Sequence, residues 1–207
     1  MAATTPLPLV QAAGLGFAHP GTPVFAGLDL HIVPGLTLLR GGDGRGKTTL
    51  LRVLAGTLQP TAGWLQRAPG TTVFFATLAD PALDAVVARD WLAAQAAASP
   101  GWNADVATAL QDAFALGTHL AKPLFMLSTG SRRKLGLVAA AASGAALTLL
   151  DTPYGGLDAP SGRVLSQLLA EAAEGKQGTQ RAWVLADHGL PPALDAVRLA
   201  ALVDLGD

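Results

Sequence analysis

A glycine-rich pattern at residues 41–48 limits the possible folds of this chain more than any other feature of its sequence. The residues read Gly-Gly-Asp-Gly-Arg-Gly-Lys-Thr and fit the spacing G-x-x-x-x-G-K-[ST]. An apolar run at 36–39 precedes the pattern, and a helix-like stretch at 47–55 begins inside it. A loop in this context joins a buried strand to a helix and turns its backbone N–H groups toward phosphate oxygens. The sequence therefore predicts a phosphate-binding loop, and the context disfavours the alternative of a glycine turn without a ligand.

The residue types of this loop suit a magnesium-bound nucleotide. Glycines allow the backbone conformations and the close approach to phosphate that a Cβ atom would obstruct. Lys47 adds a positive charge for the β- and γ-phosphates, and Thr48 offers its hydroxyl to Mg²⁺. The amino terminus of the following helix adds a partial positive charge. The predicted ATP-binding residues of the loop are Gly41, Gly42, Asp43, Gly44, Arg45, Gly46, Lys47, Thr48 and Thr49.

Apolar segments alternate with helix-like stretches along the rest of the chain. Short apolar segments, bounded by Gly or Pro, lie at 36–39, 72–76, 146–150, 183–186 and 199–205. Helix-like stretches lie at 47–55, 84–98, 105–115, 131–142 and 161–173. This alternation is typical of an α/β fold whose mostly parallel sheet is buried on both faces.

Two regions depart from this alternation. The opening segments 7–17 and 24–33 are joined by the turn-rich residues 19–23, which predicts an antiparallel pair of strands flanking the sheet. Residues 78–122 are almost wholly helix-like and predict a small inserted helical lobe. We expect a single domain over residues 1–207, with an α/β core at about 1–77 and 123–207.

The charge balance and the composition argue against several classes of protein. The 14 basic and 15 acidic side chains nearly cancel, so we expect no nucleic-acid partner. The chain has no cysteine, which excludes disulfides and thiolate metal sites. The longest uncharged apolar run, 135–150, is interrupted by Ser143 and Gly144 and is shorter than the roughly 20 residues of a membrane-spanning helix. Residues 1–11 lack the pattern of a secretory signal, so we expect the protein to stay inside the cell.

Two further motifs follow the loop. Residues 127–131 read Leu-Ser-Thr-Gly-Ser and precede a helix-like stretch. Serines in this position most often cap the helix, and the basic residues 132–134 are expected to form a solvated turn. Asp151 ends an apolar strand and is followed at 157–158 by Leu-Asp. An aspartate that ends a buried strand near a phosphate loop is the expected partner of Mg²⁺.

In the order of these motifs the chain resembles the ATP-binding cassette family over nearly its whole length. The resemblance implies that Ser128 and Gly130 present a helix amino terminus to the γ-phosphate of ATP on a second subunit. It implies that Asp151 acts on Mg²⁺ and that His188, after the strand 183–186, is the switch histidine. Phe17 is the aromatic residue implied to stack on adenine, with a place in the protein core as its alternative role.

The residues implied in hydrolysis depart from the family pattern. Thr152 stands where the family usually has a glutamate that polarises the attacking water, and a threonine hydroxyl cannot act as a carboxylate base at neutral pH. The two glutamates of the chain lie elsewhere, at 171 and 174. Asp158, Asp187 and His188 remain as substitutes for the missing carboxylate.

The other departures lie in the glutamine loop and in the signature. Thr77 stands where the family places a glutamine that senses Mg²⁺, and Thr129 and Ser131 stand where Gly and Gln are usual in the signature. We therefore expect the residues that bind nucleotide to be better preserved than those that hydrolyse it.

The short helical lobe and residues 50–63 make the chain similar to the small ATPase subunit of the heme exporter used in cytochrome c maturation. The resemblance implies a cytoplasmic ATPase subunit, held at the inner face of the cell membrane by an integral-membrane permease. It also implies that the subunit forms a homodimer or pairs with a second ATP-binding cassette. The alternative is a degenerate cassette that binds ATP and relies on a competent partner cassette for hydrolysis, which Thr152 and Thr77 favour. The length of the chain disfavours a soluble cassette that acts on translation or DNA.

Overall fold

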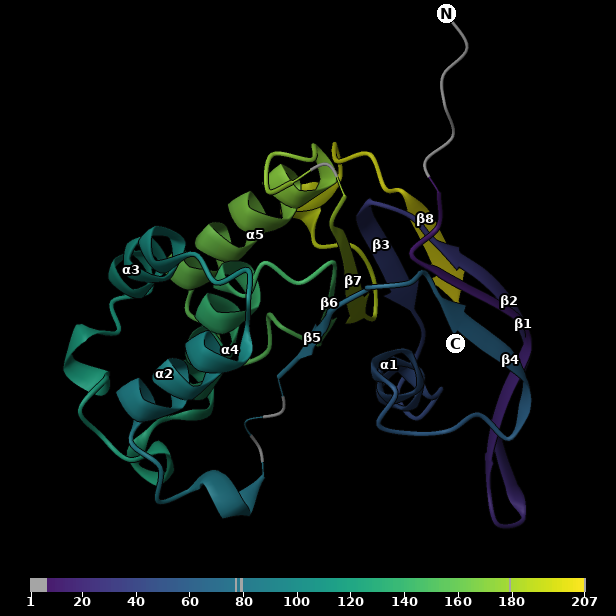
Figure 1. Cartoon of the computed structure of the whole chain (residues 1–207), viewed down its shortest axis with the longest axis horizontal. Coiled ribbons are helices and arrows are strands. Elements are labelled where there is room, and N and C mark those ends of the chain that lie inside the picture. Colours follow the sequence, from purple (N-terminus) through teal and green to yellow (C-terminus); the bar gives the residue numbers. More distant parts are fainter. Residues whose placement is uncertain (1–6, 77, 79, 179, 207) are drawn as a thin grey trace, which may run out of the picture. The chain divides into compact units, whose positions relative to one another are not determined.

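The computed structural model describes residues 7–76, 78, 80–178 and 180–206. Its contacts divide the chain into two compact units. The first comprises the described residues of Met1–Val73, Ala146–Thr152 and Leu169–Asp207, and the second comprises those of Phe74–Ala145 and Pro153–Leu168 (Figure 1). The second unit thus extends well beyond the 78–122 that the sequence predicts for a helical lobe. Thr77, the residue at the predicted glutamine-loop position, lies outside the described residues.

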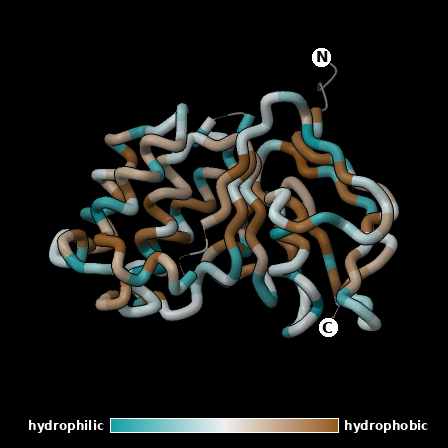
Figure 2. Tube along the Cα trace, turned by 60° about the horizontal axis from the view of Figure 1, so that its bottom comes forward, coloured by the Kyte–Doolittle hydropathy of each residue, from teal (hydrophilic) through white to brown (hydrophobic). Residues whose placement is uncertain are grey.

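A five-stranded parallel sheet confirms the predicted α/β fold. Its strands lie in the order β5-β6-β7-β3-β8, and the β6–β7, β7–β3 and β3–β8 pairs are parallel. Leucines of the inner strands are buried, and Figure 2 draws the central strands mostly in the brown of hydrophobic residues. The strands span Gly35–Arg40 (β3), Val73–Phe75 (β5), Leu147–Asp151 (β6), Ala182–Asp187 (β7) and Ala201–Asp204 (β8).

Helix α1 (Lys47–Ala55) packs on β6 and β7 through buried leucines. It ends at Gly56, whose φ of 81° is left-handed, a conformation that glycine adopts without steric cost. Arg67 donates to Leu54 O through Nε at 3.1 Å and through Nη2 at 2.6 Å. A cation at this end of the helix complements the partial negative charge of the free carbonyls. Arg67 therefore stabilises the carboxyl end of α1, the helix that begins with the loop residue Lys47.

An antiparallel sheet forms the other part of the first unit. The predicted pair is confirmed as β1 (Val10–His19) and β2 (Thr22–Ile32). A third strand, β4 (Ala62–Arg67), pairs with the other edge of β1 and was not predicted. It is largely exposed and lacks the apolar pattern of a buried strand. A Cβ atom on Gly63 would lie 2.3 Å from Gly14 O, so this pairing requires glycine where the two strands cross closely.

The second unit is mainly helical. The stretch predicted as a helix over 84–98 becomes helical only at Ala88, because Val87 is extended and forms a bridge with Pro123, and the Ala88 N–H donates to Lys122 O at 3.0 Å. No helix in the described part of the chain is both long and apolar enough to cross a membrane. The helical elements are η1 (Pro81–Leu83), α2 (Ala88–Ala98), α3 (Ala104–Ala113), η2 (Gly117–His119), η3 (Leu124–Met126), α4 (Thr129–Ala142) and the first part of α5 (Ala159–Ala173).

Candidate functional site

The predicted phosphate loop joins β3 to α1 in the first unit. Gly44 and Gly46 have φ angles of 75° and 92°, in the left-handed region that favours glycine. A Cβ atom on Gly46 would lie 2.5 Å from Val24 Cγ1 and 3.1 Å from Phe25 Cδ1, so strand β2 leaves no room for a side chain there. Gly46 is also the N-cap of α1, and the structure gives this helix start no side-chain cap and no acidic residue in the first turn. Such a helix terminus is suited to an anion.

The lysine and threonine that end the loop are already held by polar partners. Lys47 is only 7% exposed, and its Nζ donates to Gly41 O at 2.5 Å and to Gly42 O at 2.8 Å. Thr48 Oγ1 donates to Asp151 Oδ2 at 2.6 Å, which brings together the two residues predicted to act on Mg²⁺. One buried cation of the loop and one hydroxyl–carboxylate pair, between the loop and Asp151, therefore lie where β3 and β6 end.

Thr152 follows Asp151 in a strained backbone conformation. Its φ of 40° is left-handed, a region that β-branched residues rarely occupy. The Thr152 N–H donates to Ala186 O at 2.8 Å, which holds the residue against the end of β7. Strain of about 1–3 kcal/mol is typical of such residues, which cluster at functional sites.

His188 lies directly beyond β7 and reaches the phosphate loop. Its Nε2 lies 3.3 Å from Asp43 Oδ1, and its backbone N–H donates to Asp187 Oδ1 at 2.8 Å. Both side chains of the His188–Asp43 pair are mostly exposed. The structure thus brings the predicted switch histidine to the loop by a contact with one of the predicted ATP-binding residues.

An aromatic cluster lies at the end of the β1–β2 hairpin. Phe17 is only 7% exposed, and its ring centroid lies 6.5 Å from that of Phe25, which packs on the phosphate loop at Gly46. The exposed His19 meets the Phe17 ring edge-on, with centroids 5.2 Å apart. Burial favours the core role of Phe17 over the adenine-stacking role. His19, the last residue of β1, is the exposed ring of this cluster, and nothing in the sequence around it distinguishes it from other histidines.

The signature residues begin α4 in the second unit. Ser128 is the N-cap of this helix, and its Oγ accepts from the Ser131 N–H at 3.1 Å and lies 3.0 Å from Ser131 Oγ. Ser128 therefore has the capping role that its position predicts. A Cβ atom on Gly130 would lie 2.3 Å from Gly156 O, so this position requires glycine.

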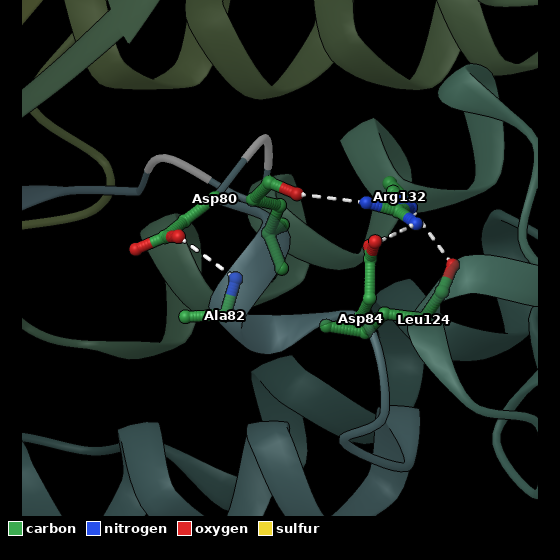
Figure 3. Close-up of polar contacts among 6 residues, drawn as sticks. Asp80, Ala82, Asp84, Leu124 and Arg132 are labelled. Carbon is green, nitrogen blue, oxygen red and sulfur yellow. Dashed lines mark hydrogen bonds and ion pairs between the residues drawn. The ribbon is translucent and has the colours of Figure 1, made fainter.

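Arg132 fixes the first turn of α4 to the distant residues Leu78 and Asp84 and to the nearby Leu124 (Figure 3). Its guanidinium donates to Leu124 O at 2.8 Å and Leu78 O at 3.2 Å, and it forms an ion pair with Asp84 Oδ1 at 2.8 Å. The expectation of a solvated turn at residues 132–134 is therefore wrong for Arg132. It is also wrong for Lys134, which pairs with Asp158 and is only 13% exposed.

The Asp158 carboxylate pairs with a lysine and caps the first turn of α5. Its Oδ2 lies 2.7 Å from Lys134 Nζ, and its Oδ1 accepts from the Ser161 N–H at 2.9 Å. The Lys134 hydrogen bond and then the Ser161 hydrogen bonds hold the pKa of Asp158 well below the ordinary value of an aspartate. A carboxylate with so low a pKa is a weak proton acceptor, because a general base works best with a pKa near the operating pH.

These residues form two groups, one in each unit. The first unit brings together the phosphate loop, Asp151, Thr152 and His188. The second unit holds Ser128, Gly130 and Asp158 within its own helices and loops. Each group is fixed locally by contacts within its own unit.

A parallel sheet with a glycine-rich phosphate loop at the start of α1 defines a nucleotide-binding α/β domain. The chain belongs to the ABC transporter family, whose model matches residues 25–155, and is an ATP-binding subunit of that family. It is 36% identical to a Cupriavidus necator protein named cytochrome c biogenesis ATP-binding export protein CcmA, over 94% of this chain and 89% of the relative. A protein of the same name from Pseudomonas syringae is 35% identical, over 81% of this chain and 84% of the relative.

Solved structures share the fold. An ATP-binding protein from Pyrococcus furiosus, described as an ABC transporter component, superposes with a TM-score of 0.71 at 20% identity and covers 95% of this chain and 96% of that one. A metal-chelate type ABC transporter in an inward-facing conformation gives a TM-score of 0.68 at 22% identity, over 95% of this chain and 80% of that one. Members of the ABC family hydrolyse ATP and generally partner with permeases.

Proposed function

We propose that this chain binds ATP with Mg²⁺ at residues 41–49 and hydrolyses it slowly, so that ATP acts chiefly as the ligand that closes two cassettes. The single observation that carries the proposal is the contrast within one site. The residues that would hold the nucleotide are paired and preorganised around Lys47 and Thr48. The position of the general base holds Thr152, which has no carboxylate.

The residues at the ends of β3 and β6 suit Mg²⁺. A hydroxyl and a carboxylate 2.6 Å apart are hard oxygen donors, and Mg²⁺ is usually held by one or two protein side chains together with substrate phosphates. Thr48 and Asp151 would hold the ion, and the ion when bound neutralises charge on the phosphates.

Hydrolysis depends on what can orient water near the γ-phosphate. Asp158 is held in an ion pair with Lys134 and is a weak base, so it is a poor substitute for the missing glutamate. His188 lies at the phosphate loop and is the better candidate, once its contact with Asp43 is released.

Pairing of two cassettes is the second part of the proposal. The exposed Ser128 and the start of α4 would face the γ-phosphate of ATP bound to the other cassette. The partner is a second copy of this chain or a cassette that retains the catalytic glutamate. The absence of a carboxylate at residue 152 favours the second of these, in which this chain mainly binds.

Substitution of Ser128 tests the pairing. Ser128→Arg places a bulky side chain in the space expected for the γ-phosphate of the opposing cassette. It also removes the hydroxyl that accepts the hydrogen bond of the Ser131 N–H. We expect ATP to cause association of the wild-type chain, alone or with its partner cassette, in sedimentation velocity. Ser128→Arg should abolish this association, whereas Ser128→Asn, which keeps a capping side chain, should preserve the helix start. Equal association of wild type and Ser128→Arg would contradict the pairing.

The adenine base is expected to stack on His19. Its imidazole is exposed beside Phe17, whose partner Phe25 packs on Gly46. Stacking on an aromatic ring contributes about 1–3 kcal/mol per base. His19→Ala should therefore weaken ATP binding about tenfold and leave the binding of inorganic tripolyphosphate unchanged, as measured by calorimetry. Phe17→Leu is the matched control and should bind ATP with nearly wild-type affinity. Weaker ATP binding in Phe17→Leu alone, with His19→Ala unchanged, would show that Phe17 is the stacking residue.

The relatives suggest the cargo. Proteins named as CcmA exporters of cytochrome c biogenesis match most of this chain, so we propose a role in heme export, with the chain held at the cytoplasmic face of the cell membrane by its permease. Loss of the gene is expected to deplete c-type cytochromes, measured by heme staining. Normal levels of these cytochromes in the deletion strain would contradict the heme role and leave the ATP-binding proposal intact.

A further inference from the structure

The segment that follows β8 lies against the beginning of the phosphate loop. The Leu205 N–H donates to Arg40 O at 2.9 Å, which continues the parallel pairing of β8 with β3. One residue further on, Gly206 O accepts from the Gly42 N–H at 3.0 Å. A residue of the predicted ATP-binding loop is thus hydrogen-bonded to a segment more than 160 positions away in the sequence.

Charged side chains fix this segment in place. Asp204 forms an ion pair with Arg40, the last residue of β3, and its Oδ1 also accepts from the Gly206 N–H at 3.0 Å. The Arg40 hydrogen bond, together with the Gly206 backbone hydrogen bond, lowers the pKa of Asp204 from its ordinary value. Gly206 has a φ of 81°, so the turn depends on a left-handed residue. The carboxylate therefore orders both the end of β3 and the turn that supplies Gly206 O.

The two segments are also closely packed. A Cβ atom on Gly41 would lie 3.2 Å from Leu205 Cβ and 3.3 Å from Gly206 O. Gly41 and Gly42 also supply the two carbonyls that hold Lys47 Nζ. Gly42 consequently accepts a hydrogen bond from Lys47 Nζ through its carbonyl oxygen and donates one to Gly206 O through its N–H.

We propose that Asp204 and Gly206 are positioning residues for nucleotide binding, because they hold the start of the phosphate loop in the conformation that places the Lys47 ammonium. The proposal rests on the role proposed above for the phosphate loop. In this role neither residue contacts phosphate itself. Each acts through Gly42, because a loop that is already ordered loses less conformational freedom when the ligand binds.

Substitutions at Gly206 separate this role from a general effect on stability. The structure leaves open space where a Cβ atom at Gly206 would lie, so the backbone conformation is what a substitution there perturbs. Gly206→Val places a β-branched residue at a left-handed φ, whereas Gly206→Asn places a residue that tolerates it. Gly70, with a φ of 76° and similar open space in the turn after β4, gives the matched control Gly70→Val.

ATP affinity and thermal unfolding are measured for all three variants. Gly206→Val should raise the Kd for ATP about three- to tenfold, the effect of about one hydrogen bond, with Gly206→Asn close to wild type. Gly70→Val should lower the melting temperature as much as Gly206→Val does and leave the Kd unchanged. Equal Kd values for Gly206→Val and Gly70→Val would overturn the proposal.

A variant of the carboxylate gives a second readout that does not depend on backbone strain. Asp204→Ala removes the acceptor of the Gly206 N–H and the partner of Arg40, and it should weaken ATP binding to a similar extent. An unchanged Kd in Asp204→Ala would count against the proposal. Lys47→Ala is measured beside it, because loss of ATP binding in Lys47→Ala with no effect at Asp204 and Gly206 refutes only the positioning role. Unchanged binding in Lys47→Ala refutes the phosphate loop itself.

Discussion

Lys47→Ala is expected to raise the Kd for ATP about 100-fold or more, because it removes the buried cation that would face the phosphates. Truncating one partner of a desolvated, hydrogen-bonded charge pair costs about 2–5 kcal/mol or more. The side chain is almost fully buried, and its Nζ is held by two loop carbonyls, so the ammonium is in place before the ligand arrives. Isothermal titration with ATP and Mg²⁺ measures the effect directly.

A charge-matched variant controls for this prediction. Lys176 pairs with Glu174 on the surface, with a side chain 66% exposed, and Lys176→Ala makes the same change in net charge. We expect Lys176→Ala to bind ATP with wild-type affinity. Similar affinities of wild type and Lys47→Ala, in a protein that unfolds at the same temperature, would remove the phosphate loop as the nucleotide site.

Thr152→Glu is expected to raise ATP turnover strongly with little change in ATP affinity. The substitution supplies a carboxylate directly after Asp151, and general-base catalysis contributes about 10²- to 10⁴-fold. It also replaces a β-branched residue at a φ of 40°, so it does not add backbone strain. The altered signature and Thr77 are expected to keep the gain toward the lower end of that range. Steady-state phosphate release, with the Kd measured in parallel, separates turnover from binding.

Thr152→Gln is the matched control, because a glutamine side chain has the same length as the glutamate of Thr152→Glu and carries no carboxylate. It relieves the same β-branched strain, so a gain caused only by backbone relaxation would appear in both variants. We expect turnover to rise in Thr152→Glu alone. A wild-type chain that already releases phosphate at about 1 s⁻¹ or faster, within ordinary enzyme rates, would mean that another group such as His188 supplies the base.

Local signals in the sequence were sufficient for the core of the fold. The helix predicted at 47–55 begins and ends as predicted because the loop pattern fixes its start and Gly56 its end. The inner strands β3, β6 and β7 were recognisable because both of their faces are buried, which makes each of them a continuous apolar run. The edge strand β8 was found from its apolar residues, although it alternates between half-buried and exposed positions. Strand β4 was not predicted because it is an exposed edge strand, and its pairing depends on the close approach of Gly63 to Gly14.

The candidate site was only partly predictable, because several of its contacts are tertiary. The phosphate loop is contiguous, so its sequence pattern identified it. The contacts of Arg132 with Leu78 and Asp84, and of Gly42 with Gly206, join residues about 50 or more than 160 positions apart, and no local pattern indicates them. The same is true of Asp158, whose pairing with Lys134 makes it a poorer base than its motif suggests.

A single-turnover experiment distinguishes a chain that binds ATP and hydrolyses it slowly from an ordinary ATPase. Trace radiolabelled ATP with Mg²⁺ is mixed with an excess of the wild-type chain, and the bound nucleotide is separated and identified as ATP or ADP over time. We predict that the label binds and stays ATP, with conversion at about 0.01 s⁻¹ or slower, a hundredfold below the lower range of ordinary enzymes. Conversion to ADP at about 1 s⁻¹ or faster would show that the chain is an ordinary ATPase, and no bound nucleotide at all would show that it does not bind ATP.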